Sequence, residues 1–198
     1  MGLMLYNDLT RRKDEFIPLH QGKVGFYVCG PTVYDYIHIG NARPFVVFDT
    51  LRRYMEHKGF EVVYVQNFTD IDDKMINKAN ELGITVKELA ERFIKAYFED
   101  VTPLGVRHAT VHPLATEHID EIIALISRIM ERGHAYVVEG NVYFDVRSLP
   151  EYGALSGHKL EDVHQGESAG TGKRDPRDFT LWKAAKPGEP SWPTPWGD

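Results

Sequence analysis

The sequence is poor in cysteine, in net positive charge and in long apolar runs. Cys29 is the only cysteine among 198 residues, so the chain cannot form an internal disulfide, and this fits the reducing cytoplasm in which we expect it. No apolar run approaches the roughly 18 residues that a membrane-spanning helix needs, and we expect no membrane contact. The formal net charge of -6 gives no compositional sign of a nucleic-acid surface.

A strand, a turn and a helix follow one another early in the chain. The apolar run over 24–28 ends at Cys29, a turn follows, and His38-Ile-Gly-Asn41 leads into an amphipathic stretch. A helix N-terminus offers free backbone N–H groups and a positive dipole end, which both suit phosphate. Glycine lets a nucleotide approach the backbone, and a histidine can donate a hydrogen bond to a phosphate oxygen. The alternative makes Gly40 a turn glycine, Asn41 a helix N-cap and His38 a partly buried polar side chain.

The apolar spacing predicts an α/β fold with a Rossmann-like parallel sheet. Strands rich in Val, Tyr and Phe are predicted over 25–29 and 61–67, and a helix is predicted over 42–58 with Gly59 as its C-terminal cap. Strand, helix and strand within about 45 residues form a parallel βαβ unit. Ligands of such sheets bind beyond the carboxyl ends of the strands, so the turn after Cys29 lies at the expected place for a site.

The remaining pattern predicts helices and one hairpin. Helices are predicted over 70–81, 86–100 and 114–133, strands over 135–138 and 141–146 around Glu139-Gly140, and a mobile loop from Gly166 to Lys173. We therefore expect a nucleotide-binding Rossmann-like half over 1–111 and a smaller α+β insertion over 112–198, which begins the return to the first domain.

Three blocks of sequence resemble one known family. They run from Phe26 to Arg43, from Tyr64 to Lys74 and from Lys173 to Trp192, and in this order they closely resemble cysteinyl-tRNA synthetases. Residues 38–41 match the first signature of class I aminoacyl-tRNA synthetases, usually written HIGH. The resemblance implies the first half of a class I catalytic domain, which the insertion separates from the second half.

The resemblance also implies an activity and its partners. Such an enzyme activates L-cysteine with ATP and Mg²⁺ to cysteinyl-adenylate, transfers it to tRNA(Cys), and is expected here to be a monomer. The second, lysine-rich signature and the anticodon-reading domains of the family are not found in these 198 residues. We therefore expect an N-terminal portion of the enzyme that is inactive by itself.

Cys29 has two interpretations. A lone cysteine is usually a small buried apolar residue, and no second cysteine lies nearby to complete a zinc pair. The resemblance instead implies that Cys29 is one of four protein ligands of Zn²⁺, with the other three absent from this sequence. A thiophilic metal would discriminate cysteine from serine far better than pocket size can.

The other candidate site residues follow from the strand–turn–helix segment and from the resemblance. His38 is the catalytic candidate, because it would bond the α-phosphate as negative charge grows on it. The remaining assignments are Thr32, His38, Gly40 and Asn41 to ATP, and Gly30, Thr69 and Asp70 to the amino-acid pocket. For Thr32 and its neighbour Tyr34, turn formation and core packing are equally good explanations.

Two further questions stay open at this point. The acidic run from Thr69 to Asp73 suits a magnesium site, but a helix N-terminus is the preferred explanation because acids are stabilised there by the helix dipole. The whole chain could also belong to a related ligase that joins cysteine to an amino-sugar, or to a non-catalytic binding module derived from the same half-domain.

Overall fold

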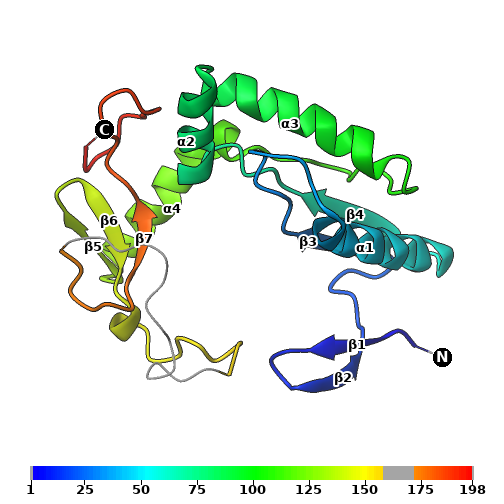
Figure 1. The fold of residues 1–198 in the computed structure, drawn as a ribbon. Helices are drawn as coiled ribbons and strands as arrows, with labels where there is room; N and C mark the ends of the chain where they lie inside the picture. The colour runs from blue at the N-terminus through cyan, green and yellow to red at the C-terminus, as the bar shows by residue number, and fades with distance from the viewer. Residues whose placement is uncertain (1, 158–171, 198) are drawn as a thin grey trace. The chain divides into compact units, whose positions relative to one another are not determined.

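The computed structural model describes residues 2–157 and 172–197. It divides the chain into two compact units, one comprising Ile17–His118 and the other comprising Met1–Phe16 with Ile119–Asp198 (Figure 1). Most of the loop expected over 166–173 lies outside the described residues. Within the described ranges, no helix is both long and apolar enough to cross a membrane.

The unit Ile17–His118 is built on a parallel βαβ arrangement. Strand β3 (Lys23–Val28) pairs in parallel with β4 (Glu61–Gln66), in unbroken register from Lys23 opposite Glu61 to Val28 opposite Gln66. Helix α1 (Ile39–His57) connects them and ends before Gly59, whose φ of 89° suits glycine. The predicted βαβ unit is confirmed, although α1 starts three residues before the predicted position 42.

A third extended segment covers the outer edge of β4. The backbone N–H of Gln66 donates to the carbonyl of Val111 at 3.0 Å, and that of Phe68 donates to the carbonyl of Pro113 at 2.9 Å. The bridges between Val65 and Val111 and between Phe68 and Leu114 are parallel. Residues 109–114 therefore satisfy backbone groups of β4 that would otherwise lie at a sheet edge.

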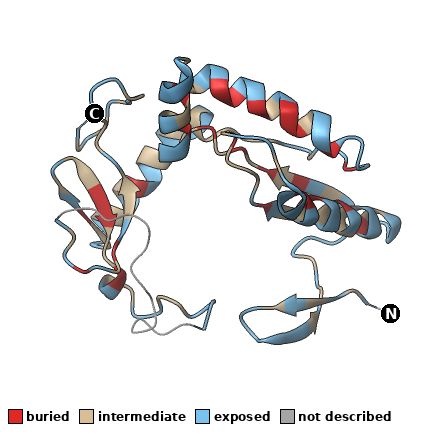
Figure 2. Cartoon of the chain, viewed as in Figure 1, coloured by how far each residue is buried: buried red, intermediate tan, exposed pale blue. Residues whose placement is uncertain are grey.

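Two helices supply the core of this unit. Helices α2 (Asp73–Leu82) and α3 (Val86–Val101) bury Met75, Leu89 and Tyr97 against Phe68, and Figure 2 shows buried residues along one face of α3. The opposite face of the β3–β4 pair is more open, because Tyr27 is 60% exposed and Val63 is 42% exposed. One face of the sheet thus carries the apolar core, while the other stays accessible among the described residues.

The second unit contains an antiparallel sheet and a helix. Strands β5 (Ala135–Val138), β6 (Asn141–Phe144) and β7 (Phe179–Trp182) form the sheet, and α4 (Ile119–Glu131) precedes it. The predicted hairpin is confirmed, since Glu139 and Gly140 both have positive φ as a two-residue type I′ turn requires. The helix predicted from 114 starts as a 3₁₀ turn, Ala115–His118, and β6 ends before 146 because a second 3₁₀ turn, Val146–Ser148, follows.

Strand β7 and a short N-terminal hairpin were not predicted. The hairpin consists of β1 (Met4–Asn7) and β2 (Arg12–Glu15). Every residue of β2 is charged, so this strand carries no apolar signal. Strand β7 belongs to the third block of sequence resemblance, and two buried carboxylates lead into it. Asp178 accepts from the Tyr136 hydroxyl at 2.6 Å, while Asp175 is paired with Arg177 at 2.7 Å. The hydrogen bonds from Arg177 hold the pKa of Asp175 well below its usual value. The bond between Asp178 and Tyr136 of β5 ties the segment before β7 to the sheet.

Candidate functional site

The N-terminus of α1 is shaped by a reciprocal pair of hydrogen bonds. The Nδ1 atom of His38 accepts from the backbone N–H of Gly40 at 3.0 Å, and the Oδ1 atom of Asn41 accepts from the backbone N–H of His38 at 3.1 Å. His38 is therefore the N-cap, and Asn41 completes a capping box from inside the helix. The expectation that Asn41 is the N-cap is wrong by three positions, because the histidine takes that role.

These contacts fix the tautomer of His38. Since Nδ1 accepts a hydrogen bond, the proton of the neutral imidazole lies on Nε2. His38, Gly40 and Asn41 are all exposed, so the alternative interpretation of His38 as a partly buried polar side chain is wrong. The Nε2–H group is consequently a donor for an external acceptor at the positive end of a 19-residue helix.

Glycine at position 40 keeps the imidazole in place. A Cβ atom built on Gly40 would lie 2.8 Å from Cε1 and 3.0 Å from Nδ1 of His38. Both distances are too short for ordinary contact, so any side chain at position 40 would displace the ring. The histidine and the glycine of this motif therefore act as one geometric unit.

Cys29 and Gly30 form the turn at the carboxyl end of β3. Cys29 is exposed, so the interpretation of it as a buried apolar residue is wrong. The backbone N–H of Gly30 donates to Oδ1 of Asn67 at 2.9 Å, across the ends of the two parallel strands. A Cβ atom at Gly30 would lie only 1.7 Å from the carbonyl oxygen of Asn67, so glycine is required by the close approach of the two backbones.

Thr32 and Thr69 continue the parallel pairing beyond the strands. The backbone N–H of Thr69 donates to the carbonyl of Pro31 at 3.1 Å, and that of Val33 donates to the carbonyl of Thr69 at 3.1 Å. The structure thus brings four of the predicted site residues to one edge, namely Cys29, Gly30, Thr32 and Thr69. Asn67 lies at the same edge, although the sequence analysis does not predict it as a site residue. Its position directly after β4 is the signal that could have indicated this.

The acidic run splits between two roles. Asp72 is the N-cap of α2 and accepts from the backbone N–H of Lys74 at 2.8 Å, which confirms the helix-cap interpretation for this residue. Asp70 is buried and accepts from the backbone N–H of Thr116 at 3.1 Å and from its hydroxyl. The helix predicted from Asp70 therefore begins only at Asp73, because Asp70 is engaged with another segment.

A metal site is not assembled by the residues that the structure describes. Among them, no three His, Cys, Asp or Glu side chains gather closely enough to hold an ion. His108 and His112 instead pack against Phe98, with the His108 ring stacked on it at 4.2 Å. Cys29 alone does not fit a closed four-ligand zinc site, although its exposed thiol leaves it able to serve as one ligand.

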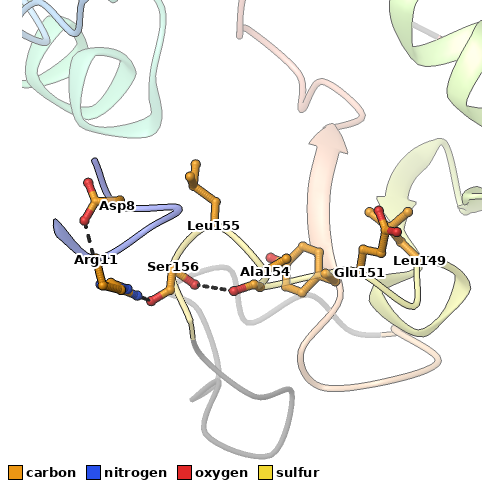
Figure 3. Close-up of a pocket in the computed structure, with 9 residues that line it drawn as sticks. Asp8, Arg11, Leu149, Glu151, Ala154, Leu155 and Ser156 are labelled. Atoms are coloured by element: carbon orange, nitrogen blue, oxygen red, sulfur yellow. Dashed lines mark hydrogen bonds and ion pairs between the residues drawn. The ribbon is translucent and has the colours of Figure 1, made fainter. Parts of the chain in front are cut away.

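A shallow pocket in the second unit contains none of the predicted site residues. It is lined by Asp8 and Arg11 of the β1–β2 turn and by residues 149 and 151–156 (Figure 3). Arg11 hydrogen-bonds to the carbonyl of Ser156 and lies 3.7 Å from the Asp8 carboxylate. The guanidinium is thus occupied by contacts within the chain itself.

Comparison with known proteins decides the family. Residues 15–198 match the family described as tRNA synthetases class I (C) catalytic domain. The chain belongs to this family. Class I (C) synthetases carry a catalytic domain of mixed α/β type, and the parallel β3–β4 pair with its crossover helix is part of that domain here. The Rossmann-like fold class expected from the sequence is confirmed.

The similar curated proteins within this class I (C) group are cysteine–tRNA ligases. The chain is 61% identical over its whole length to the enzyme of Symbiobacterium thermophilum and 60% identical over 99% of its length to that of Caldicellulosiruptor saccharolyticus. It is 56% identical over 99% of its length to the enzyme of Clostridioides difficile. The chain spans 43% of the length of each of these relatives.

A solved structure supports the fold independently. The crystal structure of the ternary complex of Agrobacterium radiobacter K84 agnB2 LeuRS, tRNA and LeuAMS matches with a TM-score of 0.52 and 21% sequence identity. The match covers 64% of this chain and 17% of that chain. At this identity the likeness concerns the fold alone.

Proposed function

We propose that the chain is part of a cysteine–tRNA ligase and forms the portion of its catalytic domain that binds ATP and the amino acid. The observation that carries this proposal is the exposed Nε2–H donor of His38 at the N-terminus of α1, in a chain 61% identical to a cysteine–tRNA ligase. A phosphate is the ligand that such a helix end suits.

The proposed reaction begins with formation of an adenylate. The carboxylate of cysteine attacks the α-phosphorus of ATP in line, a new P–O bond forms, and the bond to the leaving pyrophosphate breaks. No side chain acts as nucleophile, so positioning and charge stabilisation carry the catalysis. His38 donates from Nε2 to an α-phosphate oxygen as negative charge develops there.

The residues around His38 would bind the rest of ATP. Gly40 keeps the surface of the first helical turn free of a side chain, so the nucleotide can approach the backbone. Asn41 faces solvent beside it, and its Nδ2 group is a second donor at the same helix end. Thr32 lies at the neighbouring strand edge, where its hydroxyl would be a third side-chain donor to ATP. Mg²⁺ would enter with the nucleotide as part of the substrate.

The strand ends would hold the amino acid. Gly30 and Thr69 both lie at this edge, where Gly30 bonds to Asn67 and Thr69 pairs with Thr32, and Asp70 follows directly after Thr69. We assign Cys29 to a zinc site whose other ligands come from the part of the ligase that this chain does not span. When bound, the zinc would select the substrate thiol, because a thiophilic metal prefers sulfur to the oxygen of serine.

The second step would transfer cysteine to tRNA(Cys). We propose that the complete enzyme acts as a monomer in the cytoplasm, with cysteine, ATP and tRNA as its partners. The tRNA acceptor is the feature that separates this proposal from an amino-sugar ligase, since both would share the adenylate step.

Two assays test the proposal. Both use a full-length ligase, as long as the relatives, that contains this sequence. We expect cysteine-dependent ATP–pyrophosphate exchange, with serine as the control amino acid, and transfer of labelled cysteine to tRNA(Cys). Exchange followed by transfer only to an amino-sugar would establish the alternative ligase. Absence of exchange would leave the non-catalytic binding module as the explanation.

A further inference from the structure

Asn67 connects the ends of the two parallel strands through a single side chain. Its Oδ1 atom accepts two hydrogen bonds, from the backbone N–H of Gly30 at 2.9 Å and from the hydroxyl of Tyr27 at 2.7 Å. Its Nδ2 group lies 3.4 Å from the hydroxyl oxygen of Thr69, to which it donates. One amide therefore contacts the turn that carries Cys29 and the threonine that follows β4.

The backbones at Asn67 and Gly30 have little freedom to move relative to each other. The carbonyl oxygen of Asn67 occupies the space that a Cβ of Gly30 would need, so the two backbones are in direct contact. Directly after this contact, the backbone N–H of Thr69 donates to the carbonyl of Pro31 at 3.1 Å. The Cys29–Gly30 turn is thus held by the amide side chain of Asn67 and by the backbone ladder that follows it.

We propose that Asn67 is a positioning residue for the amino-acid pocket, because it fixes the Cys29–Gly30 turn and the Thr69 hydroxyl relative to each other. The assignment rests on the proposed activation of cysteine. Asn67 acts through its neighbours and need not touch the substrate. Losing it leaves the N–H of Gly30 without its acceptor and allows the turn to move, while the N-terminus of α1, which binds ATP, keeps its own capping box.

The proposal predicts a selective loss of cysteine affinity. In the full-length ligase we expect Asn67→Ala to raise the KM for cysteine in ATP–pyrophosphate exchange by about tenfold, as loss of one well-placed hydrogen bond does. The KM for ATP should stay within about twofold of the unaltered enzyme, because the His38 contacts are untouched. Asn67→Asp serves as a second variant if the alanine variant folds poorly. It keeps the acceptor oxygens but loses the donor to Thr69, so it should raise the same KM.

A stability-matched control separates positioning from general destabilisation. Thr85→Ala removes the N-cap of α3, which lies outside the site, and should lower the thermal midpoint without changing either KM. A KM for cysteine that stays within twofold in both Asn67 variants would overturn the assignment, as would equal rises in the two KM values. An unaltered enzyme that shows no cysteine-dependent exchange would instead refute the proposed function, and the assignment of Asn67 with it.

Discussion

The imidazole of His38 combines an observed structural role with a proposed chemical one. Its Nδ1 atom caps α1, and this contact directs the only proton of the neutral ring to Nε2. Backbone N–H groups at the helix end can already hold a ground-state phosphate, so the distinct contribution of the ring should appear as charge develops on that phosphate.

His38→Ala in the full-length ligase should therefore lower the rate of adenylate formation much more than it weakens ATP binding. We expect a loss of about 10²–10³ in rate, the usual effect of removing one preorganised donor. Pre-steady-state measurement of adenylate formation separates the two effects. An unchanged chemical rate with much weaker ATP affinity would make His38 a binding residue only.

Gly40→Ala provides an independent check of the same geometry. Alanine favours helix formation more than glycine does, so the variant should not destabilise α1 by propensity. The added Cβ would nevertheless lie 2.8 Å from Cε1 of His38 and push the ring away. We expect adenylate formation to slow while the thermal midpoint is retained, and normal kinetics in this variant would contradict the proposed ring position.

His112 should make the stability of the chain depend on pH. Its Nε2 atom accepts from the backbone N–H of Ala109 at 3.0 Å, and its Nδ1 atom lies 2.9 Å from the carbonyl oxygen of Gln66. Burial lowers the pKa of His112 below its usual value, and the nearby His108 adds to this effect. The folded state thus binds its proton less readily than the unfolded state.

Stability contributed by His112 should be complete above about pH 6.5 and should fall as the pH drops from there through the lowered pKa. The slope from one such group is at most about 1.4 kcal/mol per pH unit. Urea unfolding at pH 7.5, 6.5 and 5.5 measures it. His112→Gln, which keeps an acceptor but does not titrate, should show a shallower dependence, and equal slopes in the two proteins would refute the assignment.

At the scale of elements, the sequence predicts most helices and strands but places several helix starts incorrectly. Periodic apolar residues identified α1, α3 and the β5–β6 hairpin, because their spacing reflects a buried face. The start of α1 was missed because histidine is an unusual N-cap, and the capping box became visible only from the side-chain contacts. The β1–β2 hairpin is not recognisable from apolar patterning, because every residue of β2 is charged.

The proximity of the candidate site residues was predictable to the extent that it follows from chain order. Residues 29–32 and 69 occupy the carboxyl ends of adjacent parallel strands, so their proximity follows from the βαβ unit. The pairing of Asp70 with Thr116 was not predictable, because it joins segments 46 positions apart that share no sequence pattern. The role of Asn67 depends on hydrogen-bond geometry in the same way.

Helix α2 offers a test of the two interpretations of the acidic run. Asp72→Ala should lower the free energy of unfolding by about 1 kcal/mol, since it removes the N-cap, while Asp72→Asn should preserve most of it. Thermal and urea unfolding with and without Mg²⁺ would measure this. A magnesium site at Asp72 would instead make the unaltered chain more stable with Mg²⁺ and the asparagine variant insensitive to it.

At the scale of the molecule, the described residues contain only part of the proposed active site. The candidate ATP contacts lie at α1, but no set of metal ligands gathers around Cys29 within the described ranges. The chain spans 43% of the length of the relative from Symbiobacterium thermophilum. We expect the 198-residue chain alone to show no cysteine-dependent ATP–pyrophosphate exchange and to bind zinc at most weakly. Metal analysis after dialysis and the exchange assay check both expectations, and robust exchange would refute them.

The unbroken register of β3 and β4 has a consequence for how such a sequence can change over generations. Side chains alternate between the two faces of a strand, so inserting or deleting one residue within β4 would turn every later side chain to the opposite face. Asn67 and Thr69 would then leave the Cys29 turn together, whatever their identities. Descendants can exchange many residues of this unit singly, whereas a change in the length of β4 would alter the whole edge at once.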